Sequence, residues 1–146
     1  AQHYQAITAA CVELAARRAD PGEIEMIIAR LDRVDDHDLA HWRRASDDAV
    51  IELAALSQSA RLTREQMRLQ GEFSPLLALI DTDPAARADA RAHLRAVLAA
   101  VADGDPTASV QALRASMRFT VEWLIAYREQ HAALPALAPV GPATGP

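Results

Sequence analysis

Aspartate–proline pairs divide this chain into segments with helical periodicity. Asp20-Pro21, Asp83-Pro84 and Asp105-Pro106 each precede a stretch in which apolar residues recur every three or four positions. Aspartate is a preferred N-cap, and proline suits the first helical position because the N–H it lacks would have no partner there. Alanine is abundant, whereas β-branched runs and hairpin dipeptides such as Asn-Gly are missing. These features predict an all-α fold.

The spacing of the segments predicts an antiparallel bundle of about six helices with short connections. The first helix should run from about Gln2 to Arg18, and the last should persist to about Gln130. Gly71 and Pro75 predict a break or kink near residues 71–75 of the fourth helix. The tail from Leu134 onward holds four prolines and two glycines in 13 residues and is predicted to be non-helical. We therefore expect a domain at residues 1–131 and a C-terminal tail at 132–146.

Size, charge and cysteine content exclude several classes of protein. The 146 residues suit one domain. The formal charge is −5 and lysine is absent, so this piece is not expected to bind nucleic acid directly. A single cysteine, Cys11, rules out an internal disulfide, suits a reducing compartment such as the cytoplasm, and reads as a small buried hydrophobe. No apolar run reaches the ~20 residues that a membrane span needs. The chain starts without Met and almost directly in a helix, which suggests a piece of a longer protein.

The stretch from Asp38 to Ser59 predicts an amphipathic helix with one anomaly. Ser46 interrupts its apolar face, and Ser116 lies beside the apolar stripe of the last helix in the same way. Such a hydroxyl either bonds back to its own helix, or orients a ligand inside an apolar cavity. Periodicity leaves both readings open. The apolar face comprises Leu39, Trp42, Ala49, Val50, Leu53 and Leu56, and the opposite, solvated face comprises Arg43, Arg44, Asp47, Asp48 and Glu52.

Residue patterns typical of catalysis are missing from the sequence. It has no glycine-rich phosphate loop, no Gly-x-Ser-x-Gly elbow, no Cys-x-x-Cys pair and no His-Glu-x-x-His. His37 and His41 have metal-ligand spacing, but His37 falls at a helix start and His41 on the side of Arg44 and Asp48. Two exposed histidines are the expected outcome. We therefore do not expect an enzyme.

Three segments together resemble the FCD domain, the C-terminal effector-binding domain of FadR-type regulators in the GntR family. They read LAARRADPGEIEMI, DLAHWRRASDDAVIELAALSQSARL and RAVLAAVADGDPTASVQALRASM, and the resemblance covers about residues 4–128. It implies an antiparallel helical bundle that dimerises and holds a small molecule in a central cavity. It also implies a DNA-binding winged helix N-terminal to Ala1, outside this chain.

The resemblance further implies a metal in many members of the family. An Asp and a His four apart on the long helix, with one His on each of the last two helices, bind that metal. Those positions fall on Ser46, Val50, Leu94 and Ser116, and His93 is one residue off and rotated by about 100°. Hydroxyls and aliphatic groups are not ligands for a transition metal. We therefore expect neither a metal nor another cofactor.

The expected function is a metal-free effector sensor and homodimerisation domain of a bacterial transcription regulator. A small, mostly apolar or weakly polar organic ligand would contact residues on four helices: Thr8, Trp42, Ser46, Val50, Leu94, Ser116 and Thr120. The alternative is a degenerate module kept for dimerisation alone. That alternative predicts a filled core, with Trp42 occupying the former metal position.

Overall fold

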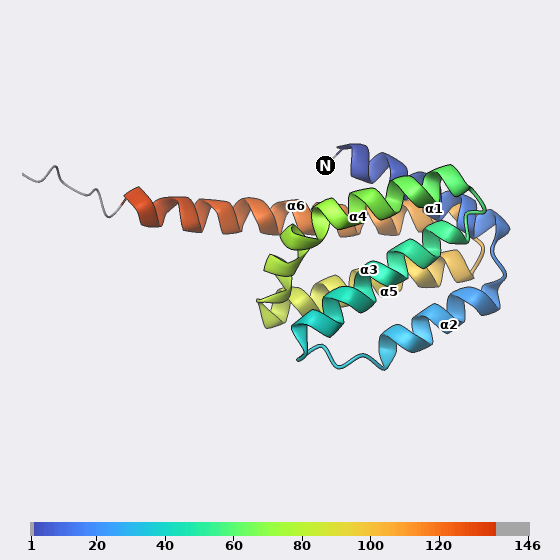
Figure 1. Cartoon of the computed structure of the whole chain (residues 1–146), viewed down its shortest axis with the longest axis horizontal. Coiled ribbons are helices and arrows are strands. Elements are labelled where there is room, and N and C mark those ends of the chain that lie inside the picture. Colours follow the sequence, from blue (N-terminus) through green and yellow to red (C-terminus); the bar gives the residue numbers. More distant parts are fainter. Residues whose placement is uncertain (1, 137–146) are drawn as a thin grey trace, which may run out of the picture.

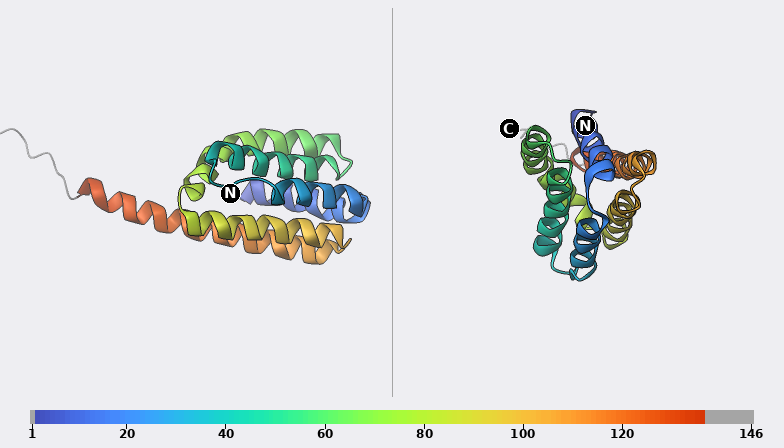
Figure 2. Two further views of the ribbon diagram at one scale, coloured as in Figure 1. Left: turned by 90° about the horizontal axis from the view of Figure 1, so that it is seen from below. Right: turned by 90° about the vertical axis from the view of Figure 1, so that its right-hand side faces the viewer.

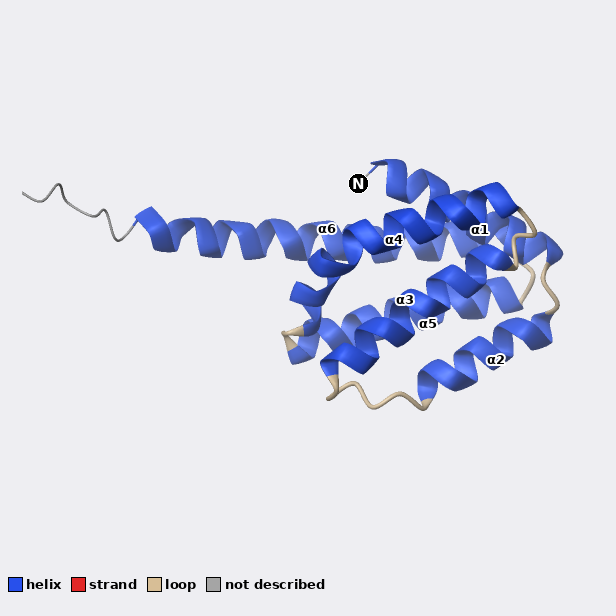
Figure 3. Cartoon of the chain, viewed as in Figure 1, coloured by secondary structure: helices blue, strands red, loops and turns tan. Residues whose placement is uncertain are grey.

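The chain folds into helices joined by short connections (Figure 3). The computed structural model describes residues 2–136. In that range six helices are present and no strand. Their bounds are α1 (Gln2–Arg18), α2 (Pro21–Asp32), α3 (Leu39–Ala55), α4 (Ala60–Asp81), α5 (Pro84–Ala102) and α6 (Pro106–Ala136). The predicted all-α bundle of about six helices is confirmed.

Short polar side chains begin the helices as the sequence predicted. The carboxylates of Asp20, Asp38 and Asp83 accept hydrogen bonds from backbone N–H groups in the first turns of α2, α3 and α5, at 2.9–3.1 Å. Asp105 caps α6 in the same way, at 3.0 Å from the N–H of Ala108. Each cap satisfies a donor that the helix itself cannot pair, so these starts are encoded locally.

Helix α1 is the centre of the bundle and contacts α3, α4, α5 and α6 (Figures 1 and 2). Its buried face is made of small side chains, including Cys11, Val12 and Ala15, which are at most 1% exposed. Small residues allow neighbouring helices to approach closely. Ile24 of α2, Leu53 of α3 and Leu98 of α5 complete the main core around them.

Helix α4 is continuous but bent, which confirms the predicted kink. Pro75 lies inside the helix, and Figure 1 shows the last turns of α4 running at a marked angle to the first part. Proline removes one backbone hydrogen bond and clashes with the preceding turn, which accounts for the bend. The bend directs the end of α4 across the bundle, where Ile80 and Asp81 are buried.

Helix α6 is longer than predicted. It runs to Ala136 rather than ending near Gln130, so the first residues of the predicted tail 132–146 are helical, and the expectation of a non-helical tail from Leu134 is wrong at residues 134–136. The segment 131–134 is rich in alanine, a strong helix former, and Pro135 removes a bond only at the last turn. The stacked rings of Tyr127 and His131, with centroids 3.8 Å apart, support the same stretch. Residues 137–146 lie outside the described residues, and the division into domain and tail stays a prediction.

Within residues 2–136, no helix combines the length and apolar character that crossing a bilayer requires.

Candidate functional site

A cavity of about 280 Å³ lies between α1, α3, α4, α5 and α6. Most of its wall is aliphatic and aromatic, with Val12, Phe73, Leu77, Leu113 and Met117 among the lining residues. Ligand sites typically combine such a wall with a few placed polar groups. The cavity is therefore the candidate site.

All seven residues proposed from the sequence line this cavity. They come from four helices: Thr8 from α1, Trp42, Ser46 and Val50 from α3, Leu94 from α5, and Ser116 and Thr120 from α6. Helical spacing had placed them on inward faces, and the packing of the helices brings those faces together.

Ser46 agrees with both interpretations that the sequence left open, the bond to its own helix and the hydroxyl that faces a cavity. Its side chain is buried, and its Oγ donates to the carbonyl of Trp42 at 2.8 Å, the back-bond to its own helix. It also lines the cavity, so its lone pairs remain available. The hydroxyl of Ser116 has no hydrogen-bond partner among the described residues, although it lines the same space.

One end of the cavity is polar, and Asp81 is its centre. The carboxylate accepts from the indole Nε1 of Trp42 at 3.1 Å and from Nη1 of Arg43 at 3.0 Å. Asp81 is only 2% exposed. Burial raises the pKa of the carboxyl, and the nearby guanidinium and indole N–H oppose that rise only in part. The cavity thus contains a buried carboxylate whose charge is incompletely compensated.

The polar end continues across α3, α4 and α1. Nε of Arg43 donates to Asp47 at 3.2 Å, and the amide of Gln70 donates to the same carboxylate at 2.7 Å. The hydroxyl of Tyr4 donates to Oε1 of Gln70 at 2.8 Å. The pKa of Tyr4 is raised, chiefly because the ring is buried. This chain of bonds fixes the positions of the polar atoms that face the cavity.

The solvated face predicted for the long helix is wrong at two positions. The side chains of Arg43 and Asp47 are only 18% and 17% exposed, because α4 packs against both: Gln70 and Ser74 bond Asp47, and Asp81 bonds Arg43. Arg44 and Asp48 are exposed, as predicted. Asp81 is the largest omission, because the sequence shows it only as part of a turn before Asp83-Pro84. Nothing in its local pattern indicated a buried ion pair.

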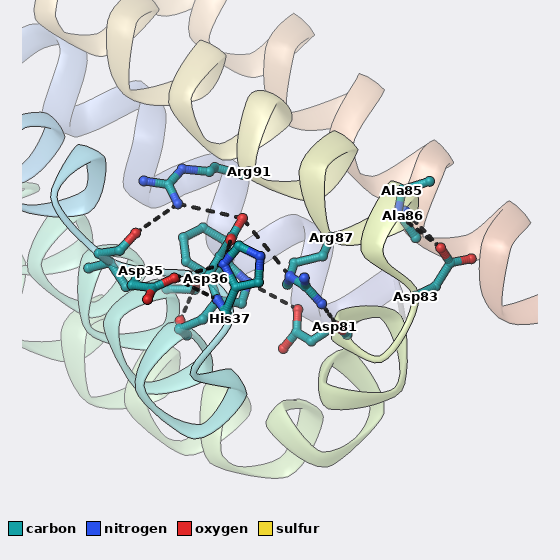
Figure 4. Close-up of polar contacts among 12 residues, drawn as sticks. Asp35, Asp36, His37, Asp81, Asp83, Ala85, Ala86, Arg87 and Arg91 are labelled. Carbon is teal, nitrogen blue, oxygen red and sulfur yellow. Dashed lines mark hydrogen bonds and ion pairs between the residues drawn. The ribbon is translucent and has the colours of Figure 1, made fainter.

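Two arginines of α5, Arg87 and Arg91, contact Asp81 and Trp42 without lining the cavity themselves, and Figure 4 shows both of them near Asp36. The guanidinium of Arg91 lies 5.0 Å from the centroid of the Trp42 ring, and Nη1 of Arg87 donates to the backbone oxygen of Asp81 at 2.7 Å. Both cations approach the Asp36 carboxylate, at 3.9 Å from Arg87 and 3.7 Å from Arg91. Cation–π contact and ion pairing therefore hold Trp42 and the end of α4 in place.

The residues at the family's metal positions do not fit a metal. Ser46, Val50, Leu94 and Ser116 all line the cavity, but valine and leucine offer no donor atom and the Ser46 hydroxyl is bonded to its helix. Transition metals prefer imidazole, carboxylate or thiolate ligands. The neighbouring His93 packs its ring against Phe119, with centroids 5.2 Å apart, and does not line the cavity.

One group of metal-ligand type, with two exposed members and one half-buried member, occurs among the described residues, outside the cavity. Asp35, Asp36 and His37 have ligand atoms within 4.8 Å of one another in the connection before α3. His37 contacts Asp35 at 2.9 Å, and His41 is exposed on α3. His37 and His41 therefore lie at the surface, as the sequence predicted.

The fold and the cavity define a class: a helical bundle enclosing a space of small-molecule size. The family model for the FCD domain matches residues 1–119, so the chain belongs to the FCD-domain family, the C-terminal effector-binding domains of GntR-family regulators. FCD domains belong to transcription regulators. No curated protein and no solved structure matched the chain.

Proposed function

We propose that this chain senses a small organic effector, without a metal, as the C-terminal domain of a FadR-type regulator. The observation that carries the proposal is the cavity, because its wall includes the four positions at which family members bind a metal and offers hydroxyls and hydrocarbon there instead. A ligand-free dimerisation module would have a filled core, so the cavity favours a sensor. A regulator of this kind would act in the cytoplasm.

The effector would work by selecting one arrangement of a homodimer. DNA would be bound by a winged-helix domain N-terminal to Ala1. A ligand that prefers one dimer geometry shifts the population toward it and so changes the spacing of the two DNA-binding domains.

Exposed apolar residues beside the cavity support self-association. Leu76 of α4 and Val121 of α6 line the cavity yet are 42% and 38% exposed, and Ile125 is 52% exposed one turn farther along α6. Glu122 and Arg128 flank Ile125 by three residues on either side, on the same helical face. An antiparallel two-fold contact centred on Ile125 would place each Glu122 opposite an Arg128 of the second copy.

A melting-temperature screen against small metabolites tests the sensor. A binding metabolite raises Tm of the parent, and Ser46→Leu and Ser116→Leu should each abolish that rise by occupying the cavity. If both variants respond like the parent, the binding site lies elsewhere. Sedimentation equilibrium tests the dimer, with Ile125→Glu expected to give monomers and Met26→Glu, at an exposed position on α2, as the control.

A further inference from the structure

The hydroxyl groups of the cavity present lone pairs rather than hydrogens. Ser46 and Thr120 each donate to the carbonyl four residues earlier on their own helix, at 2.8 and 3.0 Å. The Thr8 hydroxyl donates to one of two acceptors, the Tyr4 carbonyl at 2.8 Å or Oε1 of Gln66 at 2.9 Å. A hydroxyl has a single hydrogen, so these three can only accept a further bond. Ser116 is the exception, because its hydroxyl has no partner among the described residues and can serve as donor or acceptor.

Several N–H and O–H groups at the polar end are also committed. The Tyr4 hydroxyl donates to Gln70 at 2.8 Å, the indole of Trp42 to Asp81 at 3.1 Å, and the Gln70 amide to Asp47 at 2.7 Å. A ligand that reaches this end therefore meets these acceptors together with the Arg43 guanidinium, whose Nε and Nη1 bond Asp47 and Asp81 and whose Nη2 has no partner among the described residues.

The charged side chains at the polar end carry a net negative charge. Arg43 lies between two carboxylates, at 3.2 Å from Asp47 and 3.0 Å from Asp81, so the three groups together carry a net charge of −1 when both acids are ionised. The next cations, Arg87 and Arg91, do not line the cavity and donate to backbone carbonyls. A ligand carboxylate would add a third negative charge, whereas an ammonium group would neutralise the cluster.

The pKa of Asp81 agrees with this balance. It is raised because burial outweighs the attraction of Arg43 and the indole hydrogen bond. A second cation beside the Asp81 carboxylate would add positive charge that Arg43 alone does not supply.

We propose that the cavity selects a compact apolar amine, bound as its ammonium, over carboxylates of the same size. The inference rests on the proposed sensor function and names its ligand class. The ammonium would lie at the Asp81 end with Ser46 as a further acceptor, and the hydrocarbon part would lie among Val50, Leu94 and Leu113. A cavity of ~150 Å³ holds benzene. The cavity here, at about 280 Å³, therefore suits roughly twice that size.

Four probes of matched shape test the preference: benzylamine, benzyl alcohol, benzoate and toluene. Binding of each to the 146-residue chain is measured by calorimetry at neutral pH. We expect benzylamine to bind at least about tenfold more tightly than benzoate, with benzyl alcohol between them. Toluene reports on the cavity alone, because it has no polar group.

Single substitutions test which residues cause the preference for the amine. Asp81→Asn should reduce the preference for benzylamine over benzyl alcohol about tenfold, and Asp89→Asn, at an exposed position on α5, should leave it unchanged. Ser46→Ala, a small change on a good helix former, should weaken the amine and the alcohol but not toluene, and it keeps the test usable if Asp81→Asn fails to fold.

The outcomes separate the inference from the function it rests on. Toluene binding combined with equal or tighter binding of benzoate would overturn the amine preference and leave the sensor cavity in place. The same holds if the three polar probes bind alike. If none of the four probes binds, toluene included, both the preference and the proposed sensor site are refuted.

Discussion

Replacing Ser116 by leucine should stabilise the protein, because the new side chain enters an existing space. Ser116 lines the cavity of about 280 Å³, and its hydroxyl has no partner that the change would orphan. Leucine adds about three buried carbon groups in place of the hydroxyl, which at ~0.8 kcal/mol per methylene amounts to about 2 kcal/mol. For a chain of this length, 1 kcal/mol corresponds to a Tm shift of roughly 3 °C, so Tm should rise by about 6 °C.

The same substitution at Ser109 is a matched control on the same helix. Ser109 is fully buried, its hydroxyl donates to the carbonyl of Asp105 at 2.7 Å, and it does not line the cavity. Leucine there must displace packed atoms, which typically costs about 1–3 kcal/mol. Thermal unfolding followed by far-UV circular dichroism compares the two variants with the parent. If Ser116→Leu lowers Tm as Ser109→Leu does, the space beside Ser116 is not available and the cavity reasoning fails.

Three further outcomes follow from the titratable groups. Burial raises the pKa of Cys11 to about 11, so the native thiol should not react with Ellman's reagent at mildly alkaline pH, and rapid labelling of the folded protein would contradict its burial. Arg68, and then His3, lower the pKa of Glu65 to about 2 from 4.5, so its contribution to stability is present above pH 4.5 and is lost as the pH falls toward 2. In Glu65→Gln that loss should be absent, as measured by the free energy of unfolding against pH at low salt. The native pKa of Asp81 is raised above 3.8, so the folded state holds this proton more tightly and the contribution of Asp81 to stability falls as the pH rises through the native pKa. Asp81→Asn should lack this decline, and an unchanged pH profile would place the raised pKa elsewhere.

The helices could be predicted from the sequence because the start of each helix depends on residues that are neighbours in the chain. Asp20 and Asp83 cap helices within three residues of themselves, and the prolines after them suit the first turn. The kink is equally local, because Pro75 disrupts the turn that precedes it. The inward faces that carry Ser46 and Ser116 follow from helical spacing along single helices.

The polar end of the cavity could not be predicted by the same reasoning. Periodicity sorts the residues of a helix into one buried and one solvated face, and Arg43 and Asp47 fall on the solvated one. Helix α3 is covered on two sides, however, because α4 packs along it and then bends across its beginning. The direction of that bend depends on tertiary packing, and it alone brings Asp81 within 3.0 Å of Arg43.

The contacts that hold Trp42 in the cavity wall favour a ligand-binding domain over a degenerate module kept for dimerisation alone. Protein interiors are normally close-packed, so a space of about 280 Å³ with a mostly apolar wall is unfavourable for a domain that binds nothing there. The Trp42 indole is the largest fully buried side chain and lines this space, yet a hydrogen bond to Asp81 and the Arg91 guanidinium over its ring hold it in the wall. In a domain kept only for dimerisation, replacing the Asp81 carboxylate would release the indole to fill the space and remove a buried charge. A fold that instead maintains both the charge and the space is expected where ligand binding offsets their cost.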